Sequence, residues 1–555
     1  MKRNTLTTAV VAGLTGMAGM VSVSNAVNVN PDGMGQVLLY PYYTARGGND
    51  TLISIVNTTE RGKAVKIRFR EALNSRDVLD FHIYMSPYDV WTAAVTATDA
   101  GGAKLLTSDT TCTVPYISGD DSYGGSVDFL DFDYAFEGGD DFVTDPSFDG
   151  GPKEIERTAS GYIEVIEMAS MLAVPDEEPE DDSAEYVAWA AKHADGEPND
   201  CQALVNAWTE NAAEDAVLGG AWLDDETTGF DSDDGVPTGG LFGSASIISV
   251  SEGTMFSYNA TAIDGFFDAG DIDHEEPGLE TPNLETRGTA ATSYAFNGTD
   301  VDEHTWDFFD GESENAMLAL NAVITHDKLM NEYTTDPTAA AQTEWVVTFP
   351  TKKFHVDGVD EVIPPFTRTW SYDADADSPK LTEACEDVSF VYYDREEAGV
   401  PTADTPAAEA VKPVVSPKPP IEASEEEETI PFQLCREANV IRFASDDEVP
   451  AASEILKESS RADTFPKLGY SNFELPYASG WAQLELADVP DGGVDDINTR
   501  QSVASEEGEY VEGLPVIGFG VTTYTNGNNG DGVLANYGGT FQHRTSRNVA
   551  VSSAN

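Results

Sequence analysis

The chain has 555 residues, and its 30 lysines and arginines stand against 99 aspartates and glutamates, so its formal net charge at pH 7 is −69. A surface of this charge repels nucleic acid phosphates and anionic lipid headgroups, which excludes both as partners. Hydrophobic residues still make up 40% of the chain, enough to bury a core. The composition therefore predicts a folded protein with an acidic, solvated surface of the halophilic type.

Residues 1–26 have the organisation of a secretory signal peptide. Lys2 and Arg3 precede an apolar stretch at 9–23, and small residues precede an expected cut after Ala26. Loss of this segment removes two cations and no acids, so the mature charge would be 28 − 99 = −71. We expect an exported protein in the periplasm, at the cell surface or outside the cell. No later stretch approaches the roughly 18 to 20 apolar residues of a transmembrane segment.

The first block of the mature chain, residues 27–115, is predicted to be β. Apolar residues alternate with lysine and arginine along 63–70, which gives one apolar and one cationic face. We expect the cationic face to meet water or the acidic insertions rather than a bound anion. The predicted strands of this block cover residues 37–43, 51–56, 63–70, 79–85 and 90–95.

The middle of the chain, residues 116–470, is predicted to be an acidic insertion or second domain of mixed structure. Its predicted strands cover 162–168, 247–250 and 345–349, and its predicted helices cover 184–192, 202–210 and 313–326. Residues 402–430 are rich in proline and glutamate, and this composition predicts a linker or solvated loop.

Alternating strands return near the end of the chain, at 481–486, 516–524 and 533–543. Both ends are therefore β in pattern and less acidic than the middle. This predicts a mainly β fold in which residues 27–115 and 471–548 together form one immunoglobulin-like β-sandwich.

Four cysteines in an exported chain predict two disulfides. They are Cys112, Cys201, Cys385 and Cys435. Pairing each with its nearest neighbour in sequence is favoured, because each such bond would enclose a polar insertion, but the other two pairings stay open. A zinc site is the alternative, and it lacks a CxxC pair or a neighbouring histidine.

The sequence contains no recognisable catalytic motif, and we assign no catalytic residue. The best candidate metal site is Asp373, Asp375 and Asp377, because alternating carboxylates can converge on Ca²⁺, which takes six to eight oxygen ligands. Ser378 replaces the glycine of an EF-hand loop, so a solvated acidic loop is the alternative. Trp91, Trp345 and Trp481 are candidates for a sugar-stacking platform or for core packing.

Several strings extend across the mature chain: 37–43 with 49–52, 239–248, 345–352, 514–519 and 536–541. Together they resemble a family of uncharacterised exported or cell-surface proteobacterial proteins. The resemblance implies an exported envelope protein and supplies no site residues.

Two classes of function remain. The first is an exported, acidic, non-enzymatic surface or structural envelope protein, adhesin-like or surface-layer-like, with envelope components, glycans or further copies of itself as candidate partners. The alternative is an exported carbohydrate-active enzyme or carbohydrate-binding module. A cleft lined by exposed aromatics and a carboxylate pair about 5 to 10 Å apart would favour the alternative.

Overall fold

The computed structural model describes residues 26–551 with the exception of a set of internal segments. These segments are 136–148, 176, 180–183, 211–216, 225, 228–229, 231–234, 268–271, 286–291, 307–312, 359–360, 374–379, 397–429, 445–451, 459–470, 475–476, 490–497 and 529–533. The expected signal peptide up to residue 25, the loop at 402–429, and both Asp375 and Asp377 therefore lie outside the described residues.

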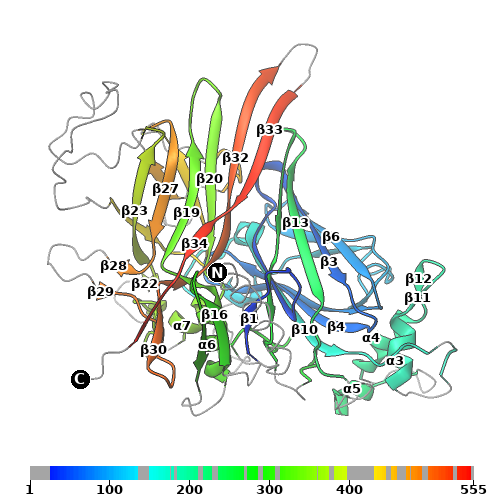
Figure 1. The fold of residues 1–555 in the computed structure, drawn as a ribbon. Coiled ribbons are helices and arrows are strands. Elements are labelled where there is room, and N and C mark those ends of the chain that lie inside the picture. The colour runs from blue at the N-terminus through cyan, green and yellow to red at the C-terminus, as the bar shows by residue number, and fades with distance from the viewer. Residues whose placement is uncertain are drawn as a thin grey trace, which may run out of the picture.

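The fold is mainly β, as predicted, and its longer strands form four sheets (Figure 1). The first sheet has the order β1 (Asn28–Val29), β15 (Thr261–Asp264), β2 (Val37–Thr44), β10 (Ser160–Ser170), β4 (Lys63–Glu71), β5 (Asp77–Met85) and β8 (Cys112–Val114). The second has the order β14 (Thr254–Asn259), β13 (Leu241–Ser249), β3 (Asn49–Asn57), β6 (Val90–Ala97), β7 (Ala103–Leu106) and β9 (Ser126–Asp128).

These two sheets share one hydrophobic core. Tyr40 and Ile67 of the first sheet and Ile55, Trp91 and Phe256 of the second belong to the same buried cluster. The alternation along β3, where every second residue is buried, is what places one face of the second sheet in this core.

The third and fourth sheets form a second pair around their own core. The third has the order β24 (Ile430–Leu434), β23 (Glu386–Asp394), β27 (Ser479–Glu485), β19 (Lys328–Thr334) and β34 (Arg544–Ser546). The fourth has the order β26 (Ser471–Glu474), β25 (Ala438–Ala444), β20 (Ala341–Thr348), β32 (Ile517–Asn528) and β33 (Leu534–Gln542). Trp345 and Phe443 of the fourth sheet pack with Phe390 and Leu484 of the third.

The strand pairing differs from the expected sandwich built by the two ends of the chain. Residues 27–115 complete their sheets with β10 and β13–β15, while β32 and β34 pair with β20 and β19 from the expected insertion. The two ends do touch, since Tyr42 and Phe519 lie in one buried cluster. Alternation determines which face of a strand is buried, but it does not determine which strand becomes its hydrogen-bonding neighbour.

Helices lie at the margins of the sheets, and Figure 1 shows one group at the lower right. This group, α3 (Ala184–Ala191), α4 (Cys201–Ala207) and α5 (Ala221–Asp224), shares a buried cluster with Tyr84 of β5. The disulfide Cys112–Cys201 ties β8 to α4. A longer helix, α6 (Ser313–Ile324), packs against β1, β16 (Thr292–Phe296) and β31 (Leu514–Pro515). Among the described residues, no helix is long and apolar enough to cross a membrane.

The remaining elements are short. They are η2 (Arg46–Gly48), α2 (Phe132–Ala135), η3 (Ile155–Ala159), β11 (His193–Ala194), β12 (Glu197–Pro198), β17 (Val301–Thr305), β18 (Thr325–His326), α7 (Lys352–Val356), β21 (Ser371–Asp373), β22 (Lys380–Thr382), β28 (Asp488–Val489), β29 (Asn498–Thr499), β30 (Glu509–Glu512) and β35 (Asn548–Val551).

The cationic face of β4 is buried rather than solvated. The Nζ atom of Lys63 lies 2.6 Å from a Glu167 carboxylate oxygen on β10, and Arg70 Nε lies 3.6 Å from Glu164. Lys66 donates to the Thr281 carbonyl oxygen at 2.9 Å, so the segment 272–285 covers this face. Buried cations require such partners, because an uncompensated charge in the interior costs several kcal/mol.

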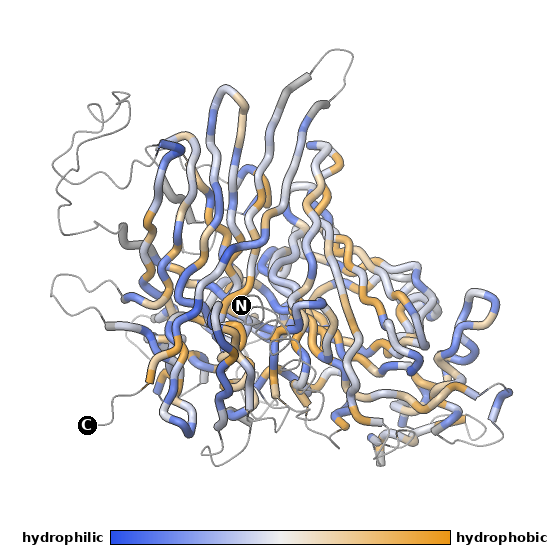
Figure 2. Tube along the Cα trace, in the orientation of Figure 1, coloured by the Kyte–Doolittle hydropathy of each residue, from blue (hydrophilic) through white to orange (hydrophobic). Residues whose placement is uncertain are grey.

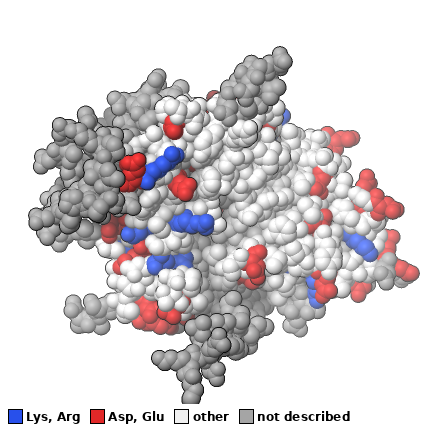
Figure 3. Space-filling view, turned by 45° about the horizontal axis from the view of Figure 1, so that its top comes forward, with Lys and Arg blue, Asp and Glu red and all other residues white. Residues whose placement is uncertain are grey.

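Charge and hydropathy follow this architecture. Figure 2 shows hydrophilic and hydrophobic residues mixed along the strands, as expected where one face of each strand is buried. Figure 3 shows a face of the molecule on which acidic side chains gather near the right margin, while the central area carries few charges.

Candidate functional site

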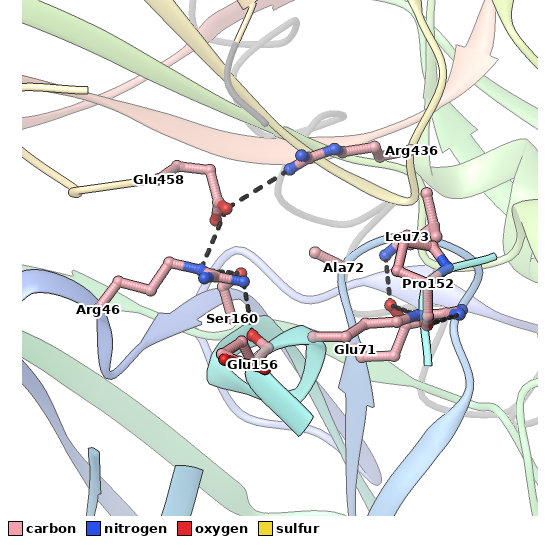
Figure 4. Close-up of a pocket in the computed structure, with 10 residues that line it drawn as sticks. Arg46, Glu71, Ala72, Leu73, Pro152, Glu156, Ser160, Arg436 and Glu458 are labelled. Atoms are coloured by element: carbon pink, nitrogen blue, oxygen red, sulfur yellow. Dashed lines mark hydrogen bonds and ion pairs between the residues drawn. The ribbon is translucent and has the colours of Figure 1, made fainter. Parts of the chain in front are cut away.

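One hollow is a charged cavity of about 250 Å³ at the junction of the two sheet pairs (Figure 4). It is lined by Arg46, Glu71, Ala72, Leu73, Pro152, Glu156, Arg157, Ser160, Arg436 and Glu458.

The charges around this cavity are bonded to one another. Arg157 donates to Glu71 at 2.8 and 2.9 Å and to Asp149 at 2.6 and 3.0 Å. Figure 4 shows Arg46 and Arg436 pointing to Glu458 from different sides, and their nitrogens lie 3.1 and 3.9 Å from its Oε1 atom. Burial acts to raise the pKa of Glu458, but the two arginines outweigh burial and hold this pKa below its usual value.

The cavity therefore belongs to a network that joins the two sheet pairs. Glu458 also accepts a hydrogen bond from Tyr42 on β2, and the backbone amides of Glu437 and Ala438 both donate to the Ala72 carbonyl oxygen. With its guanidinium groups and carboxylates paired inside the protein, the network stabilises the junction and is not assigned a ligand.

The second hollow, which we call the aromatic groove, has a volume of about 600 Å³ and is formed by the third and fourth sheets. It is lined by Glu332, Tyr333, Thr334, Tyr393, Asp394, Arg395, Gly480, Trp481, Thr522, Tyr524 and Phe541.

One wall of the groove is a row of residues across the third sheet. The strand register places Trp481 of β27 opposite both Glu332 of β19 and Tyr393 of β23. The rings of Tyr393 and Trp481 stack with centroids 4.8 Å apart and planes 18° apart. Trp481 is 39% exposed, so this stacked pair offers an aromatic surface to a ligand.

Further lining residues come from β32 and β33, which extend beyond the neighbouring strands at the top of Figure 1. Tyr524 and Phe541 are 41% and 49% exposed. Between them along this face, Thr522 of β32 pairs with Gly539 of β33. The Phe541 ring lies over Gly539, where a Cβ would stand 3.1 Å from the ring carbon Cε2.

Polar groups stand among these rings. Glu332 and Asp394 contribute carboxylates that accept hydrogen bonds, and Arg395 contributes a donor. Burial raises the pKa of Tyr333 above its usual value, and neighbouring Tyr392 and Asp394 raise it further, so this phenol stays protonated at neutral pH. Flat aromatic faces with a few convergent polar groups are the usual features of a small-molecule or sugar site.

The structure separates the three tryptophans considered for a sugar-stacking platform. Trp91 and Trp345 are fully buried in two different cores, and only Trp481 lies in the groove. Sequence reasoning missed Tyr393, Tyr524 and Phe541 as its companions. Tyr524 stands just before a glycine- and asparagine-rich turn, and this position was its only signal, while no local pattern marked Phe541.

The cysteines pair as favoured, Cys112 with Cys201 and Cys385 with Cys435. In the described part of the chain, the only group of side chains close enough to hold a metal is Glu383 with Cys385 and Cys435, and both sulfurs of this group are in a disulfide.

The expected calcium site is not tested by the structure. Asp373 is the last residue of β21, and its two companions, Asp375 and Asp377, lie in the segment 374–379 outside the described residues. The site remains a prediction.

Comparison with known proteins adds no relative to this picture. No family model, no curated protein and no solved structure matches the chain.

Proposed function

We propose that this chain is an exported, acidic, non-enzymatic surface protein that binds glycan in the aromatic groove. The observation that carries the proposal is the stacked Tyr393–Trp481 pair, which lines a groove together with Tyr524, Phe541 and two carboxylates. The C–H groups on one face of a sugar ring pack against an aromatic face, while its hydroxyl groups donate to carboxylates.

The export part of the proposal rests on the signal-like residues 1–26 and on the two disulfides, which persist in oxidising compartments. The resemblance to exported or cell-surface proteobacterial proteins supports the same location. We further propose that each pair of sheets is an immunoglobulin-like β-sandwich, because each pair buries its facing side chains in a common core.

The binding proposal is tested with the mature chain on an array of surface glycans, followed by calorimetry on those that bind. Trp481→Ala removes half of the stacked pair and should weaken binding at least about tenfold, which corresponds to about 1.4 kcal/mol. Tyr88→Ala is the matched control, because Tyr88 is 68% exposed and stands outside the groove. Equal affinity of both variants, or no glycan bound at all, would overturn the proposal.

The non-enzymatic part is tested separately by measuring new reducing ends after long incubation with every bound glycan. Binding without release of reducing ends supports the proposal. Release that is lost in Glu332→Gln or Asp394→Asn would instead establish the carbohydrate-active enzyme, because these are the carboxylates of the groove.

A further inference from the structure

We propose that the aromatic groove selects glycans that carry free amino groups, such as polymers of unacetylated hexosamine, over their N-acetylated and uronic acid counterparts. The inference rests on the proposed function, since it names the ligand class of the same groove.

The groove's carboxylates belong to Glu332 and Asp394. Glu332 lies opposite Trp481 on β19, and Asp394 lies opposite the adjacent Gly480 on β23. Trp481 and Glu332 therefore share one face of the third sheet, and a ligand over Trp481 has the Glu332 carboxylate beside it, while Asp394, which follows Tyr393 in β23, projects from the other face.

The groove has more acidic than basic side chains. Its lining holds two carboxylates and one guanidinium, that of Arg395, so the groove has a net negative charge. Among the residues that the structure describes, no lysine or arginine forms an ion pair with the Glu332 carboxylate. Glu332 is exposed, so its carboxylate is open to a ligand ammonium.

The aromatic surface of the groove also favours a cationic ligand. An ammonium within about 6 Å of a tryptophan or tyrosine ring is attracted to the negative face of the ring. The Tyr393–Trp481 stack thus favours a protonated amino sugar over a neutral one of the same shape. N-acetylation removes this charge, and it leaves only the packing of the sugar ring.

The electrostatic field of the whole molecule acts in the same direction. With a net charge of −69, the protein attracts cations and repels anions around every hollow on its surface. A uronic acid glycan would bring more carboxylates into a groove that already holds Glu332 and Asp394. Both the carboxylates of the groove and the negative field of the whole protein therefore oppose the binding of anionic glycans.

The test compares four oligomers of equal length with the mature chain at 0.15 M NaCl: hexaglucosamine, hexa-N-acetylglucosamine, hexagalacturonate and hexalysine. We expect hexaglucosamine to bind at least about tenfold more tightly than its acetylated form and no measurable binding of the uronate. Trp481→Ala should weaken both neutral and amino sugars.

The general field must be separated from the groove, because any cationic oligomer is drawn to so acidic a protein. The double variant Glu332→Gln, Asp394→Asn should abolish the preference for the amino form while keeping the binding of the acetylated form. The matched control is Asp300→Asn, Glu303→Gln, which removes two exposed carboxylates away from the groove. The control should keep the preference, and unchanged melting temperatures establish that all variants fold.

Each outcome has a defined meaning. Equal affinity for the amino and acetylated oligomers, or the same loss of preference in both double variants, overturns the selectivity while leaving glycan binding intact. If none of the sugar oligomers binds, the proposed function itself is overturned. Hexalysine binding that depends on Trp481 as strongly as hexaglucosamine does would show a cationic peptide site and overturn the glycan assignment.

Discussion

At the scale of single residues, Arg157 is a central ion-pairing side chain of the network at the junction of the two sheet pairs. It holds Glu71 and Asp149, both fully buried, through four hydrogen bonds. Arg157→Ala leaves two carboxylates without their common partner, and we expect a loss of about 3 to 5 kcal/mol in the free energy of unfolding, measured in urea.

The control for this prediction is Arg368→Ala. Arg368 forms an ion pair with Asp387, but its side chain is 43% exposed. Its loss should cost less than about 1 kcal/mol, because solvent already screens the pair. Equal costs for both variants would mean that the buried network contributes no more than an ordinary surface pair.

Glu437 gives the molecule a predictable response to pH. Burial raises its pKa to about 8, and the attraction of Lys352 only partly offsets burial. The unfolded chain releases this proton near pH 4.3, so the folded state binds one more proton between that pH and about 8. Stability should therefore fall as pH rises through this window, because folding disfavours the charged form.

Glu437→Gln removes this titration. The melting temperature of the variant should fall less than that of the natural protein between pH 5 and 9. Glu344, whose pKa burial raises to about 7, still titrates, so the slope is reduced rather than abolished. Glu303→Gln, an exposed control, should leave the slope unchanged. An unaltered slope in Glu437→Gln would show that this carboxyl group is solvated.

At the scale of elements, each disulfide joins two residues that lie far apart in the sequence. Cys385–Cys435 links the residues next to β23 and β24 across a separation of 50 residues, and Cys112–Cys201 spans 89. The loop-entropy relation gives about 4 kcal/mol for the first and about 5 kcal/mol for the second. The double variant Cys385→Ser, Cys435→Ser should lose about 4 kcal/mol in the free energy of unfolding, measured in denaturant. The natural protein should lose more of this free energy when both of its disulfides are reduced.

The elements also show where sequence patterns were informative. The expected strand at 63–70 is β4, because alternation of apolar and charged residues is a local signal. The expected helix at 313–326 is close to α6, because a serine at the start of a helix is a local signal as well. The expected strand at 247–250 is in fact β13, which begins at Leu241 and ends at Ser249. Its earlier part contains Gly243, Ser244 and Ser246, which have little of the β-branched or aromatic character that predicts a strand. Hydrogen bonding to β14 on one side and β3 on the other stabilises it as a strand.

At the scale of the whole molecule, charge predicts a strong dependence of stability on salt. The mature chain would carry 28 − 99 = −71 charges, whose mutual repulsion mobile cations screen within about 10 Å at 0.1 M salt. The melting temperature should rise as NaCl increases from low to molar concentration. A flat response would mean that the acidic segments lie too far apart to repel one another.

Calcium would act in addition to this screening if the site at Asp373, Asp375 and Asp377 exists. Millimolar Ca²⁺ should then raise the melting temperature beyond a NaCl control of matched ionic strength, because a ligand that binds only the folded state stabilises it. Replacing all three aspartates by asparagine should remove that increment. Equal melting temperatures with and without Ca²⁺ would leave only a solvated acidic loop.

The sequence by itself determined the composition-dependent and local properties: the acidic surface, the β class, the positions of most strands and the favoured cysteine pairs. These follow from side-chain charge, alternation and spacing along the chain. Only the tertiary structure decided that residues 27–115 pair with β10 and β13, and that Trp481, Tyr393, Tyr524 and Phe541 line one groove. Those four residues come from four strands of two sheets, and strand order depends on long-range hydrogen bonding and shared burial, which no local pattern encodes.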